Sequence, residues 1–276
     1  MHLVVQAPRV SDADVAALLR VIGAERAIRL GDGAVRIAAV APSDTIAQYC
    51  DAHRFDHAFV PAERRRDRVG LVAIDMDSTL ITIECIDEIA DMQGIKPQVA
   101  AITASAMCGE IDFPESLRRR VGLLAGLEVA ALERVYDERL RLSPGAEAML
   151  AAFKAVGAKT MLVSGGFTFF TARLQQRLGL DFTASNVLEV EAGRLTGRVQ
   201  GDIVDAAVKA DAVRKMRADP ALAGKLIVGI GDGANDLPML AVADVSVAYH
   251  AKPVVRERAT CRIDYCGLDA VVNLFI

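Results

Sequence analysis

Three short apolar runs constrain the fold of this chain more than any other feature, because each of them stops at small polar or acidic residues. They are LVAID at 71–75, TMLVS at 160–164 and LIVGIGD at 226–232. Near-continuous apolar runs are typical of strands buried on both faces, as in a parallel sheet covered by helices. Helical patterns lie between the runs, for example at 145–156 and 167–178. The sequence therefore predicts an α/β fold, in which ligands bind beyond the carboxyl ends of the strands.

Two segments interrupt this alternation. Residues from about 85 to 142 separate the first run from the second, and they are rich in Ala, Leu, Met, Glu and Arg. Because that length is too great for a crossover loop, it predicts an inserted helical cap. Residues 187–200 predict a β-hairpin that turns at Ala192-Gly193, and the runs at 245–249 and 261–265 predict two further strands.

The first 62 residues follow a different pattern. Helices are predicted at 11–22 and 43–53, and strands at 2–6, 26–30, 34–40 and 57–60. The resulting β-α-β-β-α-β order is that of the small α+β ferredoxin-like fold. The arginine-rich residues 63–70 predict a linker, so that 1–62 form a separable domain and 71–276 the α/β domain. The topology of residues 1–62 is similar to that of the regulatory ACT-like domains, a likeness that rests on periodicity alone.

Composition excludes several classes of protein. Hydrophobic residues make up 53% of the 276, so the chain can form a core and is not a disordered protein. A net charge of −4 argues against a general nucleic-acid-binding surface. No apolar stretch is long enough to span a membrane, and the amino terminus lacks the basic region of a signal peptide. Five scattered cysteines with no CxxC pair fit a reducing compartment, so we expect a cytoplasmic protein without nucleic-acid or membrane partners.

The most specific motif is the segment DMDST, which follows the first apolar run at 75–79. Asp75 and Asp77 are two residues apart, so both carboxylates can point toward one site and offer the oxygen ligands that Mg²⁺ prefers. Taken alone, the motif is equally consistent with a turn that begins at Asp75 and a helix capped by Asp77.

The other strand ends favour the functional interpretation. Ser164 and Gly165 offer a hydroxyl and backbone N–H groups at a predicted helix N-terminus, which is a typical anion site. The segment GDGAND at 231–236 adds the carboxylates of Asp232 and Asp236, and Lys209 offers a cation. A nucleophile, a metal site, a phosphate cradle and a balancing lysine are the components that phosphoryl transfer requires.

These four motifs, in this order, resemble those of the haloacid dehalogenase (HAD) superfamily, which implies a HAD-like Rossmannoid sheet with a cap. Glu84 after DMDSTLITIE, the segment MCGEIDFPESLRRRV at 107–121 and SGGF at 164–167 further resemble the phosphoserine phosphatase family. The resemblance covers residues 70–270. It implies hydrolysis of O-phosphoserine, the last step of serine biosynthesis.

The resemblance also implies a role for each matching residue. Asp75 is expected to form an aspartyl-phosphate, and Asp77 to protonate the leaving oxygen and then activate water. Mg²⁺ is expected on Asp75, the backbone carbonyl of Asp77, and Asp232. The residues expected to hold the phosphate group are Ser164, Gly165 and Lys209, with Asn235 close by.

Phosphoserine carries an ammonium, a carboxylate and a phosphate, so a selective pocket needs a counter-charge for each. Glu84 is expected to face the ammonium and Arg120 the carboxylate, while Phe113 and Met107 wall the pocket and exclude water. Three alternatives stay open: a phosphotransferase that uses the same intermediate, a phosphatase for another small phosphomonoester, and a binding protein with an inactive core. Oligomeric state is also open, with a homodimer as one option.

Overall fold

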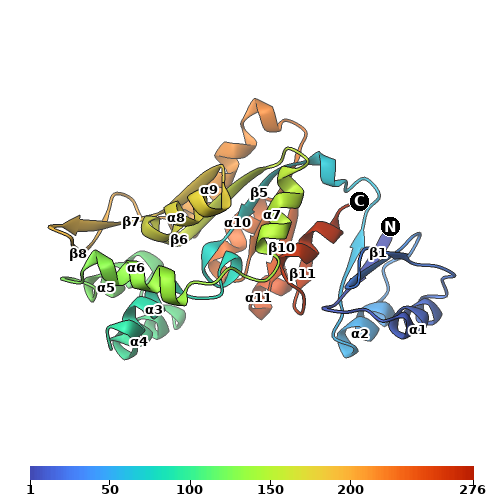
Figure 1. Cartoon of the computed structure of the whole chain (residues 1–276), viewed down its shortest axis with the longest axis horizontal. Coiled ribbons are helices and arrows are strands. Elements are labelled where there is room, and N and C mark those ends of the chain that lie inside the picture. Colours follow the sequence, from blue (N-terminus) through green and yellow to red (C-terminus); the bar gives the residue numbers. More distant parts are fainter.

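The computed structural model describes residues 1–276, and its central element is a seven-stranded sheet (Figure 1). The strand order is β11-β10-β9-β5-β6-β7-β8, and every neighbouring pair is parallel except β7 and β8. The strands are β5 (Val69–Ile74), β6 (Lys159–Phe167), β7 (Phe182–Glu191), β8 (Arg194–Gln200), β9 (Leu226–Gly231), β10 (Val245–Tyr249) and β11 (Cys261–Ile263). The predicted α/β class and each predicted strand of this sheet are confirmed.

Helices cover both faces of this sheet, as the apolar runs require. Val72 and Ile74 of β5 point into the larger core, and Leu71 and Ala73 point into the core on the opposite face. The larger core is covered by α7 (Ala146–Lys154), α8 (Thr168–Leu178) and a 3-10 helix (Leu268–Leu274). The opposite core is covered by α9 (Ala206–Arg217), α10 (Leu237–Val242) and α11 (Pro253–Arg256).

Two predicted boundaries are wrong. Strand β5 begins at Val69, two residues before the predicted start of the α/β domain, because Val69 already pairs with Leu226 of β9. Strand β6 continues past Ser164 to Phe167, since Phe167 pairs with Asn186 of β7 after a shift in register. Ser164 therefore lies within an irregular strand end, four residues before α8 begins.

The insertion between β5 and β6 is helical, as predicted. It consists of α3 (Cys85–Met92), α4 (Lys96–Met107), α5 (Phe113–Gly122), α6 (Val129–Arg134) and a final helical turn (Val135–Arg139). Its two connections to the sheet region lie side by side, because Thr82 donates a backbone hydrogen bond to Arg141 and Ile81 pairs with Leu142. We call this pair of connections the cap hinge. The hairpin β7–β8 extends from the sheet beside α5 (Figure 1).

The N-terminal region has the predicted order of elements and a four-stranded antiparallel sheet in the order β2-β3-β1-β4. Its elements are β1 (His2–Gln6), α1 (Asp12–Ile22), β2 (Ile28–Arg29), β3 (Ala34–Ile37), α2 (Asp44–Ala52) and β4 (Asp56–Val60). Ser11 begins α1 with a capping box, as the Ser-x-x-Asp pattern indicates. Strand β2 is shorter than its predicted span of 26–30.

The expected loose linker is not found. Val4, Ala58 and Val60 of the N-terminal sheet belong to the main core of the α/β region. Asp56 is buried and accepts hydrogen bonds from the backbone N–H groups of residues 264–266. Within 63–70, the N–H of Arg66 bonds to the carbonyl of the last residue of the chain. The two regions are therefore joined by a packed interface, which we call the seam.

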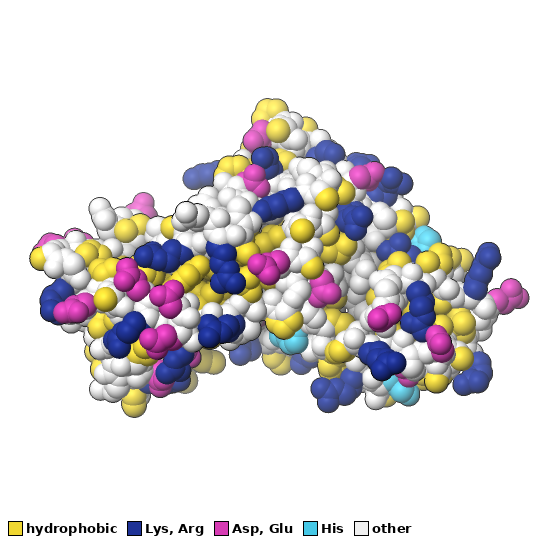
Figure 2. Space-filling model, viewed as in Figure 1, with side chains coloured by type: hydrophobic (Ala, Val, Ile, Leu, Met, Phe, Trp, Pro, Cys, Tyr) yellow, Lys and Arg dark blue, Asp and Glu magenta, His cyan; other side chains and the backbone are white.

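Acidic and basic side chains alternate over the face of the molecule shown in Figure 2, which carries no broad patch of one sign. None of the helices is long and apolar enough to cross a lipid bilayer.

Candidate active site

The polar residues at the carboxyl ends of β5, β6 and β9 meet in one pocket of about 350 Å³. Because these strands are parallel neighbours, their ends lie at the same edge of the sheet. The residues of the pocket that the sequence predicts as functional are Asp75, Asp77, Glu84, Met107, Phe113, Arg120, Ser164, Gly165, Asp232 and Asn235.

An irregular turn at Met76–Leu80 orients the two carboxylates of DMDST. Ser78 in this turn has a left-handed backbone with φ of 54°, and its hydroxyl donates to Glu84 Oε1 at 2.7 Å. One oxygen of Asp77 accepts from the N–H of Cys85 at 3.1 Å, which anchors the carboxylate to the start of α3. A Cβ on Gly166 would lie 2.9 Å from the other oxygen of Asp77, so glycine is needed for this close approach.

Lys209 lies behind Asp75. Its side chain is 1% exposed, and its Nζ donates to Asp75 Oδ1 at 2.5 Å and to Asp236 Oδ1 at 2.8 Å. Asp205 caps the first turn of α9 and so fixes the position of this lysine. Lys209 is not among the residues that line the pocket, and its expected contact with the phosphate stays a prediction. Its hydrogen-bond partners are the carboxylates of Asp75 and Asp236, so Lys209 fixes the position of the Asp75 side chain.

Three carboxylates converge at the same edge of the sheet. Asp75, Asp232 and Asp236 each offer an oxygen, and these oxygens lie within 4.8 Å of one another. Asp236 also accepts from the N–H groups of Asp232 and Gly233, which holds the loop after β9. An all-oxygen donor set of this size suits a hard divalent cation. The residues present therefore fit a metal site, to which Asp236 adds a carboxylate that the expected set of ligands did not include.

Burial and mutual repulsion raise the pKa values of the acidic groups in the pocket. Desolvation, together with the charge of Glu84, raises the pKa of Asp77 to about 7. Desolvation and the charge of Asp236 raise the pKa of Asp232 to about 6. The same two causes raise the pKa of Asp75, although Lys209 opposes them. Asp77 can therefore carry a proton near neutral pH, which suits a general acid.

The cap supplies the other side of the pocket. Phe113, Leu117 and Arg120 lie on one face of α5 because they are spaced four and three residues apart. Arg118 and Arg119 are exposed, and Arg119 pairs with Glu115, so only Arg120 of the three consecutive arginines faces the pocket. Burial disfavours the charged form of both groups. It lowers the pKa of Arg120 and raises the pKa of Glu84, which also lines the pocket.

Met107 corrects another expectation. Its side chain is 83% exposed at the rim of the pocket, because α4 ends there, so it does not exclude water in this conformation. Phe113 lies closer to the strand ends than Met107 does, because a Cβ on Gly165 would be 3.1 Å from its ring.

Three polar residues of the site were not predicted. Asn186 donates to the carbonyl of Gly165 and accepts from the N–H of Val204, so it fixes the strand end that carries Ser164. Thr79 donates to Asp232 at 3.1 Å. Lys252 lines the pocket after β10. The rule that ligands bind at strand ends could have identified Lys252, since VSVAY at 245–249 was already predicted as a strand.

Residues 72–241 match the profile of the haloacid dehalogenase-like hydrolases. A phosphoserine phosphatase of Albidiferax ferrireducens is 52% identical over 79% of this chain and 93% of its own. A probable phosphoserine phosphatase from Vibrio cholerae superposes with a TM-score of 0.87 at 35% identity, over 99% of this chain and 85% of its own. A phosphoserine phosphatase solved as a phospho-aspartyl intermediate analogue superposes with a TM-score of 0.68 at 34% identity, over 75% of this chain and 99% of its own.

The chain therefore belongs to the haloacid dehalogenase-like hydrolases and, within them, to the phosphoserine phosphatase family. This confirms the resemblance drawn from the four motifs. The identity that the chain shares with these phosphatases over most of its length defines it as an enzyme rather than a binding protein with an inactive core.

Proposed function

We propose that this protein hydrolyses O-phospho-L-serine to L-serine and phosphate, through an aspartyl-phosphate at Asp75 and with Mg²⁺ as cofactor. One observation carries the proposal: Glu84 and Arg120, from the cap, line the same pocket as Asp75 and Asp77. A carboxylate and a guanidinium thus face a nucleophile and an acid across a space of about 350 Å³. In a serine-producing pathway this reaction would be the last step of biosynthesis.

In the first half-reaction, an oxygen of Asp75 attacks phosphorus and the bond from phosphorus to the serine oxygen breaks. Asp77 transfers its proton to that oxygen, so serine leaves as a neutral alcohol. In the second half-reaction, Asp77 takes a proton from water, whose oxygen attacks phosphorus and releases Asp75. The pKa of about 7 lets Asp77 serve both steps near neutral pH.

Several residues position these groups. Lys209 orients Asp75 and balances its charge. Ser164 accepts from the N–H of Gly166 at 2.8 Å, which leaves its hydroxyl hydrogen free for a phosphate oxygen. Gly165 and Asn235 line the same pocket. Mg²⁺ would be held by Asp75, the carbonyl of Asp77, Asp232 and Asp236, and would neutralise negative charge on the phosphate.

The N-terminal region is proposed to be an ACT-like domain, on the strength of its β-α-β-β-α-β order and its β2-β3-β1-β4 sheet. A homodimer is a further prediction, which light scattering of the purified chain would test. A cytoplasmic location is likewise predicted from the scattered free cysteines.

Phosphate release from a panel of phosphomonoesters tests the proposed activity. We expect phosphoserine to be the best substrate, with turnover that requires Mg²⁺ and is lost in chelator. The Asp75→Asn variant should be folded and inactive, because an amide does not form the acyl-phosphate. Near-normal turnover by Asp75→Asn would contradict the mechanism. An added amino alcohol that captures the phosphoryl group in place of water would favour a phosphotransferase, and a better substrate without the ammonium or carboxylate would favour another phosphatase.

A further inference from the structure

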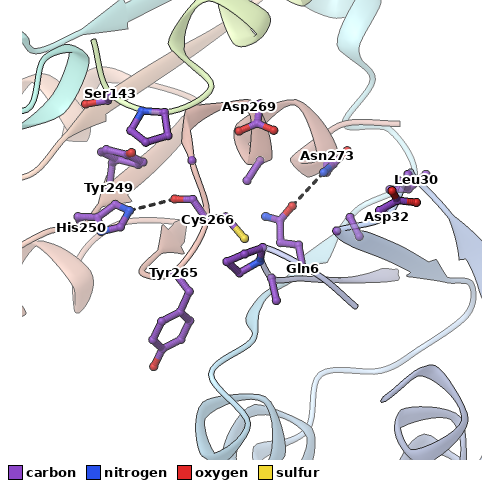
Figure 3. A pocket seen from close by; sticks show the side chains of 18 of the residues that line it. Gln6, Leu30, Asp32, Ser143, Tyr249, His250, Tyr265, Cys266, Asp269 and Asn273 are labelled. Atoms are coloured by element: carbon purple, nitrogen blue, oxygen red, sulfur yellow. Dashed lines mark hydrogen bonds between the residues drawn. The ribbon is translucent and has the colours of Figure 1, made fainter. Parts of the chain in front are cut away.

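The chain buries two amide side chains almost completely, and the two serve different parts of the molecule. Gln6 lies at the seam, where its Oε1 accepts from Asn273 Nδ2 at 3.0 Å (Figure 3). Asn186 lies in β7 and is 1% exposed, and both ends of its amide bond to the backbone beside the candidate active site. Burial of an amide is unfavourable unless its polar atoms are bonded, so the groups that Asn186 bonds indicate its role.

The nitrogen of the Asn186 amide holds the end of β6. It donates to the carbonyl of Gly165 at 2.8 Å. The regular pairing of β6 with β7 stops after Val163 and resumes at Phe167, so residues 164–166 have no paired partner in β7. The side-chain bond from Asn186 takes the place of that pairing at Gly165. It therefore fixes a segment that lines the pocket and that the strand pairing leaves free.

The oxygen of the same amide holds the start of α9. It accepts from the N–H of Val204 at 2.8 Å. Asp205, the next residue, caps α9 with its side chain, and its carbonyl accepts from the N–H of Lys209 at 2.9 Å. Lys209 in turn donates to Asp75, as described above. A continuous series of bonded contacts thus leads from Asn186 to the proposed nucleophile.

We propose that Asn186 is a positioning residue, which sets the distance between the phosphate ligands at the end of β6 and the pair of Lys209 and Asp75. Its donor fixes the first group and its acceptor fixes the second, through one planar amide. This role rests on the proposed function, which places the phosphate group at Ser164 and Gly165. Phosphoryl transfer depends on the alignment of the nucleophile with the phosphate, and a misplacement of about 1 Å can lower a rate by about 100-fold.

The contacts of Asn186 lie on the phosphate side of the pocket. The side chains that are proposed to recognise the serine part bond elsewhere, because Glu84 accepts from Ser78 and Arg120 donates to the carbonyl of Ser116. Loss of the Asn186 amide should therefore impair the binding and alignment of the phosphate and leave recognition of the serine part unchanged. A general loss of stability would instead lower the folded fraction without a preference for either part of the substrate.

Steady-state kinetics of full-length variants tests the role. Asn186→Ala removes both bonds, whereas Asn186→Asp keeps an acceptor for the N–H of Val204 and turns a second oxygen, in place of the donor, toward the carbonyl of Gly165. Per folded molecule, we expect both variants to lower kcat/KM by about 10- to 100-fold, by the same factor with phosphoserine and with phosphoethanolamine. The inhibition constant of inorganic phosphate should rise by about fivefold or more in both. Arg120→Ala provides the contrast, since its loss should depend on the substrate.

The matched control is Thr160→Val at the other end of β6. Thr160 is buried, and its hydroxyl donates to the carboxylate of Asp181 at 3.0 Å and accepts from the N–H of the same residue at 3.2 Å. The control therefore also removes two hydrogen bonds, which join β6 to the residue before β7. It should lower the melting temperature and leave kcat/KM and the phosphate inhibition constant unchanged. If Asn186→Ala does not fold, Asn186→Asp decides the question, because it keeps one of the two bonds. Normal kinetics in the folded Asn186 variants, or equal kinetic losses in Thr160→Val, would overturn the proposal.

Turnover by the wild type tests the proposed function by itself. If the wild type releases phosphate faster from another phosphomonoester than from phosphoserine, the proposed substrate is wrong, and the variants are then compared with that ester and with inorganic phosphate. An unchanged phosphate inhibition constant in the variants would contradict the role of Asn186 whichever ester is the substrate. Failure of the proposed function and failure of the role of Asn186 therefore give different results.

Discussion

The two sheets of this protein bury their faces in different ways. The catalytic sheet is covered on both sides by helices that follow its own strands. The N-terminal sheet covers one face with α1 and α2, and its other face packs on the catalytic region through Val4, Ala58 and Val60. The catalytic sheet can therefore hold charged groups whose burial is unfavourable, such as the pair of Asp75 and Lys209, at its edge. The N-terminal sheet places no residue in the catalytic pocket.

Removal of residues 1–65 should have the largest effect. It exposes the apolar face of the seam and leaves the N–H groups that Asp56 caps without a partner. The lost apolar burial alone is on the order of 5 kcal/mol, as an upper estimate from about 1.5–3 kcal/mol per side chain. We expect insoluble protein, or a melting temperature far below that of the full chain, measured by differential scanning calorimetry.

Asp56→Ala is the milder version of this experiment. It should lower the melting temperature while kcat/KM of the folded fraction stays close to wild type. The alignment with the Albidiferax relative covers 93% of that relative. It leaves about a fifth of this chain unaligned. A truncated protein that is as stable as the full chain would contradict the interpretation of the seam.

Asp77→Asn addresses the catalytic region. Because Asp77 acts as acid and then as base, the variant should lose about 10²–10⁴ in rate with phosphoserine. An activated aryl phosphate has a good leaving group and needs less protonation, so its first step should lose less. Single-turnover measurements with both substrates would show this difference, and equal losses would count against the role of Asp77.

Arg120→Ala should have a smaller effect that depends on the substrate. Loss of a charge-assisted contact of about 1.5–3 kcal/mol corresponds to a decrease of about 10- to 200-fold in kcat/KM for phosphoserine. Phosphoethanolamine lacks the carboxylate, so the variant should lose little further activity on it. Arg120→Lys should restore activity only in part, since an ammonium does not make a two-pronged contact. Equal losses on both substrates would instead assign Arg120 a structural role in the cap.

The sequence predicted the strand-end part of the pocket because its residues directly follow apolar runs. Asp75 and Asp232 come one residue after strands that are unmistakable in the pattern. The spacing of Phe113, Leu117 and Arg120 along α5 places Arg120, and not Arg118 or Arg119, on the face that lines the pocket. The orientation of Lys209 toward Asp75 depends on how α9 packs, which the local pattern does not contain.

The seam was not predicted, although the sequence carried a signal for it. Residues 3–5 are Leu-Val-Val, and 58–60 are Ala-Phe-Val, so both strands are apolar on both faces. Such runs indicate a strand covered on both sides, whereas a separable ferredoxin-like domain with one solvated face predicts alternation. The arginines at 64–66 suggested a solvated linker, but their backbone is fixed by the chain terminus.

The smallest predicted effect concerns the stability of the catalytic region itself. Burial and the charge of Glu84 raise the pKa of Asp77 from its ordinary value of 3.8 to about 7, so the folded state binds this proton more tightly than the unfolded state. The contribution of Asp77 to the free energy of unfolding should therefore fall as the pH rises from about 4 to 7, and then level off. Asp77→Asn removes the titrating group and retains an acceptor for the N–H of Cys85. In chelator, we expect the variant to be more stable than wild type at pH 8, by on the order of 1–3 kcal/mol, and nearly equal at pH 4. Denaturant unfolding at both values measures this, with Asp202→Asn as the exposed control. A variant that is less stable at pH 8 would show that the Asp77 charge is compensated in the folded state, and that this edge of the catalytic sheet carries no such cost.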